Sequence, residues 1–241
     1  MSQRGILVGS DKNGEALLEF WWKNYTLNFS YPVAFVDFGL SESGKKWCKE
    51  RGELIPFEKD ISSIVEATAP KNSLIEKFFG KNYKTHRQSW LKKPFACLMT
   101  PFKETVWIDT DCLIQKPLLQ IFYSLSKTCD IALVPEPEDV QLQSKLLKHI
   151  HKDEILYNSG VIVFRKECEV ISAWAEILIE GKEAFPGDQD ALSRVIYRNK
   201  FAVGELSPLY NWPWYAPLNR SAFIIHFMGD RGKKALHSIA A

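Results

Sequence analysis

The sequence predicts an α/β fold with a mixed, mainly parallel central sheet. Its first hundred residues alternate short runs of β-forming residues with helical patterns, which is typical of βαβ units. The apolar run 105–108 leads directly into acidic residues, and ligands of such sheets bind at the carboxyl ends of the strands. With 241 residues, 46% of them hydrophobic, the chain is long enough for one α/β domain around a single core.

The elements of the first half follow the hydrophobic periodicity. Ser41 is a typical helix N-cap, and Gly52 separates the helix after it from the next strand. We predict a strand at 6–8, a helix from about 15 to 27, a strand at 33–36, a helix from 41 to about 51, a strand near 54–56, an irregular segment at 58–82 with a short helix around Leu74 to Phe79, and a helix around 89–99 that Pro94 interrupts near its start. This order of elements is Rossmann-like.

The second half adds strands and helices around a polar stretch. We predict strands at 105–108, 131–134, 161–164 and 222–227, a helix from about 170 that stops at Gly181, and a helix from about Asp188 to Asn199. The stretch 136–154 is long and polar, contains Pro137 and follows Pro135, which predicts a surface excursion.

Composition and charge exclude several classes of function. Lys and Arg number 31 against 29 Asp and Glu, and a net charge of +2 is too small for a nucleic-acid-binding surface. The N-terminus lacks the long apolar centre of a signal peptide, and no run approaches the roughly 18 to 20 apolar residues that span a bilayer. Five widely spaced cysteines without a C-x-x-C pair favour a reducing compartment. We therefore expect a cytoplasmic protein with no nucleic-acid partner and no transmembrane segment.

The candidate metal ligands are two aspartates that follow the strand 105–108. Asp109 and Asp111 are alternate residues at the edge of the sheet where ligands bind, so both can offer oxygen to one cation. Carboxylate oxygens suit Mg²⁺ or Mn²⁺, which would bridge the diphosphate of a nucleotide. Two acids in a solvated turn are the alternative.

A histidine and a cationic segment follow the last predicted strand. His226 would complete a site with the two aspartates, and imidazole favours Mn²⁺ over Mg²⁺, although a histidine at a strand end is more often a hydrogen-bonded core residue. Gly229 would let the backbone approach phosphate closely, and Arg231, Lys233 and Lys234 would supply positive charge. The alternative for this charged run is a solvated tail.

Five motifs in a fixed order give the sequence a resemblance to a known family. The chain resembles glycosyltransferase family 8, which holds glycogenin and bacterial lipopolysaccharide galactosyl- and glucosyltransferases, over about residues 5 to 234. The motifs are Asp11 after the first strand, Lys92 ahead of Ile108-Asp109-Thr110-Asp111, Tyr157-Asn158-Ser159-Gly160-Val161, Asp188-Gln189-Asp190-Ala191-Leu192, and His226-Phe227-Met228-Gly229.

The resemblance implies a GT-A fold and a role for individual residues. Asp11 would contact the nucleotide base, and Lys92 would reach the sugar or phosphate. The divalent metal, Mn²⁺ or Mg²⁺, would be held by Asp109, Asp111 and His226, with Asp109 also near the ribose. For catalysis, Asn158 would lie beside the donor sugar, and Asp188 with Gln189 would grip the sugar hydroxyls and face the anomeric carbon.

The C-terminal motif departs from the family pattern. Gly229 and Lys233 match the diphosphate-binding segment of the family, which usually reads H-x-x-G-x-x-K-P-W. Here Gly232 stands at the expected lysine position, Lys233 comes one residue later, and the Pro-Trp pair is absent.

Several of these residues also have a purely structural interpretation. Asn158 could cap a turn before its strand, and Asp188 could be a helix N-cap with Asp190 in the first helical turn. The aromatic cluster 212–215 either stacks on a sugar in the donor or acceptor cleft or packs in the protein.

Together these features predict a metal-dependent hexosyltransferase. It would move a hexose from a nucleotide diphosphate sugar, most simply a UDP-sugar, to the hydroxyl of a carbohydrate, lipid-linked or protein acceptor, and by resemblance would retain the anomeric configuration. Residues 1–111 would form the nucleotide-binding half of the single domain, and 112–241 the half that binds donor sugar and acceptor. The alternatives are a sugar nucleotidyltransferase and a nucleotide-sugar-binding protein without activity.

Overall fold

The computed structural model describes residues 3–70 and 83–240. Within this part of the chain, seven strands form the central sheet in the order β3-β2-β1-β4-β7-β6-β8. Neighbouring strands are parallel except at β7, which runs antiparallel to both β4 and β6, so the sheet is mixed and mainly parallel as predicted. The strands are β1 (Arg4–Ser10), β2 (Val33–Asp37), β3 (Glu53–Pro56), β4 (Glu104–Ile108), β6 (Ile131–Pro135), β7 (Tyr157–Arg165) and β8 (Gly204–Glu205).

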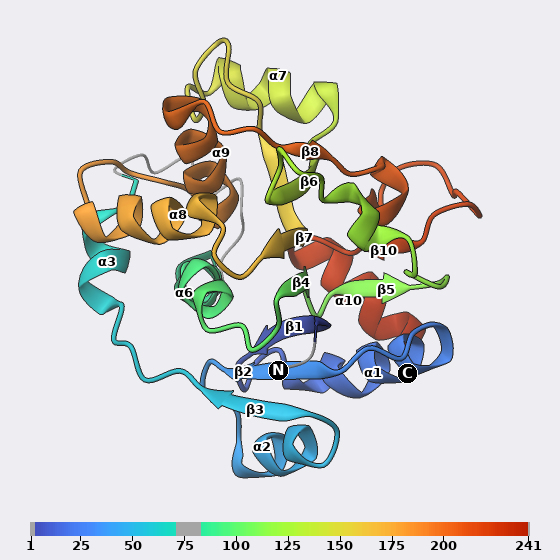
Figure 1. Ribbon diagram of the computed structural model, residues 1–241. Helices are drawn as coiled ribbons and strands as arrows, with labels where there is room; N and C mark the ends of the chain where they lie inside the picture. The colour runs from blue at the N-terminus through green and yellow to red at the C-terminus, as the bar shows by residue number, and fades with distance from the viewer. Residues whose placement is uncertain (1–2, 71–82, 241) are drawn as a thin grey trace.

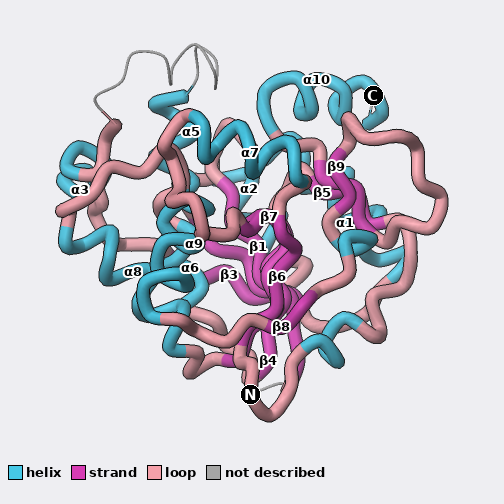
Figure 2. The backbone as a smooth tube through the Cα atoms, turned by 90° about the horizontal axis from the view of Figure 1, so that it is seen from above, coloured by secondary structure: helices cyan, strands magenta, loops and turns pink. Residues whose placement is uncertain are grey.

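Helices cover both faces of this sheet (Figure 1). Seen from above, α3, α6, α8 and α9 lie on one side, and α1, α10 and a small second sheet lie on the other (Figure 2). The small sheet has the order β5-β10-β9, with β5 (Cys112–Ile114), β9 (Trp212–Pro213) and β10 (Ile224–His226). The helices are α1 (Leu18–Asn28), α2 (Glu42–Lys49), α3 (Ser62–Ala67), α5 (Tyr83–Trp90), α6 (Lys93–Leu98), α7 (Glu138–Leu146), α8 (Glu169–Glu180), α9 (Asp188–Asn199) and α10 (Gly229–Ala240).

The inner strands β1, β2, β4, β6 and β7 are buried on both faces, which explains why they are continuous apolar runs rather than alternating ones. Successive side chains of β1 go to opposite faces: Leu7 packs in the cluster with α6, α8 and α9, whereas Ile6 and Val8 pack in the cluster with α1. In β4, Trp107 belongs to the first cluster, and Val106 belongs to the second. The sheet is therefore the middle layer of two cores.

Three local sequence signals lie at the ends of helices in the structure. Ser41 caps α2, because its hydroxyl accepts a hydrogen bond from the backbone N–H of Gly44. Gly181 ends α8 in the left-handed conformation, with φ of 61°. Pro94 lies in the first turn of α6, where its missing N–H costs nothing, so it begins this helix rather than interrupting it. The helix predicted around 89–99 is therefore mainly α6, and it reaches only the last two residues of a separate helix, α5.

Three helices were not predicted. Helix α3 falls in a segment predicted to be irregular, and α10 takes the place of the charged tail that was one alternative for 231–234. Helix α7 lies in the predicted surface excursion and buries none of its residues, so it has no apolar face to signal a helix. The short helix predicted around Leu74 to Phe79 lies outside the described residues. Among the described helices, none combines the length and apolar character needed to cross a bilayer.

The antiparallel direction of β7 has a consequence for function. Because β7 runs against β4, its first residues lie at the edge of the sheet where β1 and β4 end, and Ile108 pairs with Val161. The small sheet adds His226 to the same region, since the backbone N–H of Phe227 donates to the carbonyl of Asp111 at 2.8 Å. Residues from four distant parts of the chain therefore meet at one edge.

Candidate functional site

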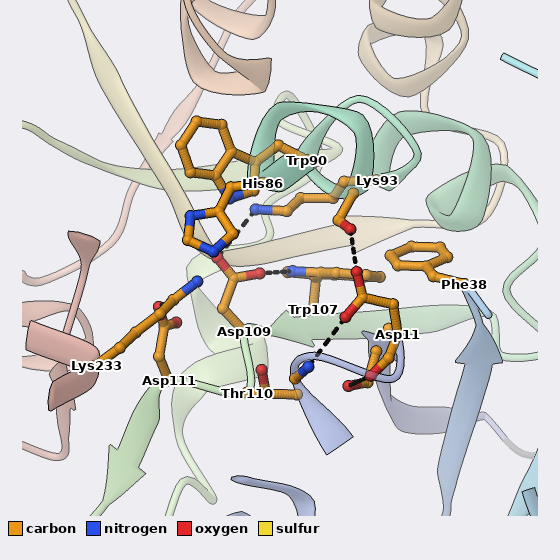
Figure 3. Close-up of a pocket in the computed structure, with 14 residues that line it drawn as sticks. Asp11, Phe38, His86, Trp90, Lys93, Trp107, Asp109, Thr110, Asp111 and Lys233 are labelled. Atoms are coloured by element: carbon orange, nitrogen blue, oxygen red, sulfur yellow. Dashed lines mark hydrogen bonds and ion pairs between the residues drawn. The ribbon is translucent and has the colours of Figure 1, made fainter. Parts of the chain in front are cut away.

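A cavity lies at this edge of the sheet, beside the carboxyl ends of β1 and β4 (Figure 3). Its walls come from the loops after these strands, from α5 and α6, and from the start of α10. Ammonium and carboxylate groups both line it, so its chemistry fits a polar, charged ligand. The lining residues are Gly9, Ser10, Asp11, Gly14, Phe38, His86, Ser89, Trp90, Lys93, Trp107, Asp109, Thr110, Asp111 and Lys233.

Asp109 is the first residue after β4, and its carboxylate is held from two sides (Figure 3). The indole Nε1 of Trp107 donates to Oδ1 at 2.6 Å, and Nζ of Lys93 donates to Oδ2 at 3.0 Å. Its backbone N–H donates to the carbonyl of Gly160 at 2.9 Å, which ties the loop to β7. The carboxylate is therefore oriented by the protein alone.

Lys93 is a buried cation that the sequence analysis missed. Its ammonium lies 3.0 Å from carboxylate oxygens of both Asp109 and Asp188, and it donates to the backbone carbonyl of Ser159 at 3.1 Å. Burial favours the neutral amine, but the two aspartates outweigh it and raise the pKa of Lys93 above its ordinary value. Lys93 is thus charged and joins the loop after β4 to the start of α9.

The neighbouring Lys92, to which the sequence analysis assigned donor contact, points elsewhere. Its Nζ donates to the backbone carbonyl of Phe38 at 2.6 Å and lies over the rings of Phe38 and Phe57. Lys92 does not line the cavity, although Phe38 does. One step along a helix turns a side chain by about 100°, so of two adjacent lysines only one faces the site.

Asp11 lies in the turn after β1, as predicted, and lines the cavity. Its Oδ1 accepts the backbone N–H groups of Asn13 and Gly14, both at 2.9 Å, and its Oδ2 accepts the hydroxyl of Ser89 on α5. The aspartate therefore fixes the turn and joins it to α5.

His226 is buried beside Asp111, which lines the cavity, and its ring lies against a glycine. Its Nε2 lies 3.3 Å from Oδ1 of Asp111 and 4.0 Å from Oδ2 of Asp109. A Cβ at position 160 would lie 2.1 Å from Cε1 of the imidazole, so only Gly160 leaves room for the ring. The structure thus brings together the three predicted metal ligands.

A chain of amides determines which nitrogen of His226 carries a hydrogen. The backbone N–H of Gly160 donates to Oδ1 of Asn158, so the amide of Asn158 has a defined orientation. The same oxygen accepts Nδ2 of Asn211, which leaves Oδ1 of Asn211 facing Nδ1 of His226 at 3.0 Å. Nδ1 must therefore be the donor, and Nε2 is the atom that faces the carboxylates.

The pKa shifts show that this point in the site favours positive charge. Burial lowers the pKa of His226, but Asp111 and Asp109 outweigh it and raise it above the ordinary value. Burial likewise opposes ionisation of Asp111, but His226 and Lys233 bring its pKa down to about 2. Burial raises the pKa of Asp109, with Lys93 opposing the shift. A proton or a metal cation between Nε2 and the carboxylates satisfies these groups.

The donor set therefore fits a divalent cation. Nε2 of His226 faces a carboxylate oxygen of Asp111 at 3.3 Å and one of Asp109 at 4.0 Å, and its other ring nitrogen is oriented by an amide, as is usual for metal-bound histidines. Oxygen and nitrogen ligands of this kind suit Mn²⁺ and Mg²⁺.

Two of the predicted catalytic residues, Asn158 and Gln189, are linked by a buried carboxylate, whereas Asp188 has other partners. Asn158 donates to Oε1 of Glu136 at 2.8 Å, and Nε2 of Gln189 donates to the same oxygen at 3.3 Å. Asp188 accepts the hydroxyl of Ser159 at 2.7 Å. Burial raises the pKa of Glu136. Glu136 was also missed by the sequence analysis, because a lone glutamate after a strand carries no motif.

The surroundings of Gly232 explain why the C-terminal segment departs from the family pattern. Gly229 adopts φ of 75°, and a Cβ there would meet nothing within 4 Å. A Cβ at Gly232 would lie 2.4 Å from the carbonyl of Phe227 and 2.7 Å from Nε1 of Trp214, so no lysine fits there. Lys233, one residue later, lines the cavity with its Nζ 3.8 Å from Oδ2 of Asp111.

The aromatic cluster 212–215 takes part in packing. Trp214 stacks on Phe227 with ring centroids 6.3 Å apart, and its Nε1 donates to the carbonyl of Met228 at 3.2 Å. Trp212 donates to the carbonyl of Pro217. None of the four residues lines the cavity.

Comparisons with known proteins agree on the fold. No protein-family model and no curated protein sequence matches the chain. The structure of the galactosyltransferase LgtC, in complex with donor and acceptor sugar analogues, is similar with a TM-score of 0.64 at 15% identity, covering 98% of this chain and 95% of LgtC. Mouse xyloside xylosyltransferase 1 has a TM-score of 0.57 at 12% identity, over 92% and 97% of the two chains. The structure of the bifunctional glycosyltransferase WbbM has a TM-score of 0.63 at 15% identity, covering 95% of this chain and 46% of WbbM. The predicted GT-A fold is thereby confirmed.

We expect Gly160→Ala to destabilise the protein by roughly 1 to 3 kcal/mol, the usual cost of overpacking. The cause is contact with the ring of His226, because the backbone of Gly160 does not have the positive φ that disfavours alanine. Denaturant unfolding of a double-mutant cycle checks this: in the His226→Ala background, the same substitution should cost less. Equal costs in both backgrounds would contradict the steric explanation.

Proposed function

We propose that this protein is a metal-dependent glycosyltransferase that moves a hexose from a UDP-sugar to an acceptor hydroxyl, with retention of configuration. The observation that carries the proposal is the convergence of Asp109, Asp111 and His226 Nε2 at the ligand-binding edge of a GT-A fold, flanked by the ammonium groups of Lys93 and Lys233. The similarity to galactosyl- and xylosyltransferase structures supports a nucleotide-sugar donor.

In this proposal the nucleoside lies on the side of the cavity formed by the loop after β1. Asp11 and Phe38 line that side, and the aspartate is held by Ser89. A carboxylate accepts N–H groups of a base, and an aromatic ring offers a stacking face. Lys92 then acts indirectly, because its hydrogen bond to the carbonyl of Phe38 positions the ring.

The diphosphate lies between the acids and the start of α10. A divalent cation held by Asp109, Asp111 and His226 supplies positive charge that stabilises the departing nucleoside diphosphate. Lys233 adds a mobile cation, and Gly229 leaves its surroundings open to the phosphates. Lys93 keeps the carboxylate of Asp109 oriented before the donor binds.

The sugar lies toward Asp188 and Gln189, and their partners bear on how configuration is retained. One carboxylate oxygen of Asp188, Oδ2, is engaged by both Lys93 and the hydroxyl of Ser159, and these contacts reduce its reactivity as a nucleophile. The amide of Gln189 is a poor nucleophile and is oriented by Glu136. These contacts support attack by the acceptor on the face from which the nucleotide leaves.

We expect the protein to release UDP from a UDP-sugar in the presence of Mn²⁺. We also expect the substitution Gln189→Ala to lower turnover while changing the free energy of UDP binding by less than about 1 kcal/mol. The assay incubates the protein with Mn²⁺ and each common nucleotide sugar and measures the nucleoside diphosphate. Formation of nucleoside triphosphate when pyrophosphate is added would instead identify a nucleotidyltransferase, and donor binding without turnover would identify a binding protein.

We expect UDP binding to depend on the metal, because the ligands form a cluster of negative charge that repels a diphosphate when no cation is bound. Calorimetry should show binding that weakens strongly in EDTA and recovers when Mn²⁺ is added in excess. Equal UDP affinity under both conditions would remove the metal site from the proposal.

We expect Lys233→Ala to weaken UDP binding about tenfold or more, the effect of losing one charge-assisted contact worth roughly 1.5 to 3 kcal/mol. Uridine lacks the diphosphate, so its affinity should stay nearly unchanged. Lys234→Ala is the matched control, because Lys234 is exposed and does not line the cavity. If Arg231→Ala weakens UDP binding and Lys233→Ala does not, the phosphate contact belongs to Arg231.

A further inference from the structure

A cysteine lies beside the carboxylate and imidazole of the site. Cys112 begins β5 directly after Asp111, and β5 pairs antiparallel with β10 so that Cys112 stands opposite His226. Directly opposed residues of an antiparallel pair project to the same face. The thiol is therefore on the imidazole's side of the small sheet, and the ligand atoms of Asp111, Cys112 and His226 all lie within 4.8 Å of one another.

The spacing of these atoms is close to that of a tetrahedral metal site. In a tetrahedral site, nitrogen and oxygen ligands at about 2.0 to 2.1 Å from Zn²⁺ are about 3.3 Å apart. A sulfur ligand, at about 2.3 Å from Zn²⁺, is about 3.6 Å from the other ligands. Nε2 of His226 and Oδ1 of Asp111 already stand 3.3 Å apart. The sulfur of Cys112 lies within 4.8 Å of a ring nitrogen of His226 and of a carboxylate oxygen of Asp111, so it needs to approach by about 1.2 Å at most.

The thiol has no strong partner that would compete with a metal. Its Sγ is 3.9 Å from the carbonyl of Gly160, a weak hydrogen bond, and the residue is 1% exposed. Gly160 is also the residue that seats His226, so thiol and imidazole share one wall. A buried sulfur beside a histidine and a carboxylate is a typical ligand set for a soft or borderline cation.

We propose that Asp111, Cys112 and His226 form a three-ligand site for a thiophilic divalent cation, with Zn²⁺ as its occupant. Binding converts the thiol to a thiolate and releases its proton to solvent. Three protein ligands leave one position open, as in exchangeable zinc sites. Asp111 and His226 are shared with the Mn²⁺ or Mg²⁺ site of the proposed function, so the two cations exclude each other. The zinc site itself does not rest on that function.

The choice of cation then depends on the sulfur. Oxygen and nitrogen ligands alone bind Mn²⁺ and Zn²⁺ in the usual order, and a thiolate favours Zn²⁺ further. Removing the thiol should therefore weaken Zn²⁺ binding by roughly tenfold or more and leave Mn²⁺ binding nearly unchanged. A selective loss of Zn²⁺ binding would show that Cys112 is a metal ligand, because a residue that only packs near the site would affect both cations alike.

Co²⁺ is a coloured substitute for Zn²⁺ and reports a sulfur ligand directly. Titrated into the full-length protein after removal of metal, it should give a thiolate-to-cobalt charge-transfer band in the near ultraviolet, which one equivalent of Zn²⁺ abolishes. The band should be lost in Cys112→Ser and retained in Cys168→Ser, a buried thiol distant from the site at the start of α8. Bound Co²⁺ without the band, or a band that persists in Cys112→Ser, would overturn the proposal.

Two further measurements keep the test decisive. If Cys112→Ser does not fold, X-ray absorption of the Zn²⁺-loaded wild-type protein should show one sulfur at about 2.3 Å, and a shell of oxygen and nitrogen only would overturn the site. No donor is present in these experiments. A missing sulfur signal beside intact Mn²⁺-dependent UDP binding therefore refutes this inference alone, whereas the sulfur signal without UDP binding refutes only the proposed function.

Discussion

The site depends on one buried ammonium group placed between two carboxylates. Lys93 contacts Asp109 and Asp188, each at 3.0 Å, and without it two carboxylates would face each other with no cation between them. Removing one partner from a buried ion pair leaves a charge uncompensated, which costs about 3 to 5 kcal/mol. The same ammonium donates to the carbonyl of Ser159. Helices α6 and α9 and strands β4 and β7 are therefore held together by the group that orients Asp109, the first acid of the proposed metal site.

Around this ion pair, the polar side chains are ordered by hydrogen bonds whose directions are all determined. The hydrogen bonds run from Glu136 through Asn158 and Asn211 to His226. Their directions follow from the backbone N–H of Gly160, which can only donate and therefore fixes the amide of Asn158. A buried polar network of this kind is rigid only when its members are satisfied. Nδ1 of His226 is thus held as a donor before any ligand arrives, so that Nε2 faces the carboxylates in the orientation that the proposed cation needs.

The sequence predicts the parts of the fold that follow from burial and from turn chemistry. Strands buried on both faces appear as apolar runs, and the acids at 109 and 111 mark the ligand-binding edge. What it misses depends on long-range contact. Lys92 and Lys93 have the same side chain, and only the orientation of α6 puts Lys93 in the site. Glu136 acquires its place through Asn158, a partner from another strand. The uses of the site stay predictions, because fold alone does not determine them.

In the proposed function, Lys233 takes the place of the phosphate-binding lysine of the family motif, although it stands one residue later in the chain. At Gly232 the backbone passes so close to Phe227 and Trp214 that a side chain cannot be accommodated. A lysine at that position would have to displace the start of α10 from the small sheet. One residue later the helix turns back toward the cavity, and the Nζ of Lys233 reaches to 3.8 Å from Asp111. This distance is too long for a hydrogen bond, so in the proposed function the ammonium is available to exchange the carboxylate for a phosphate of the donor.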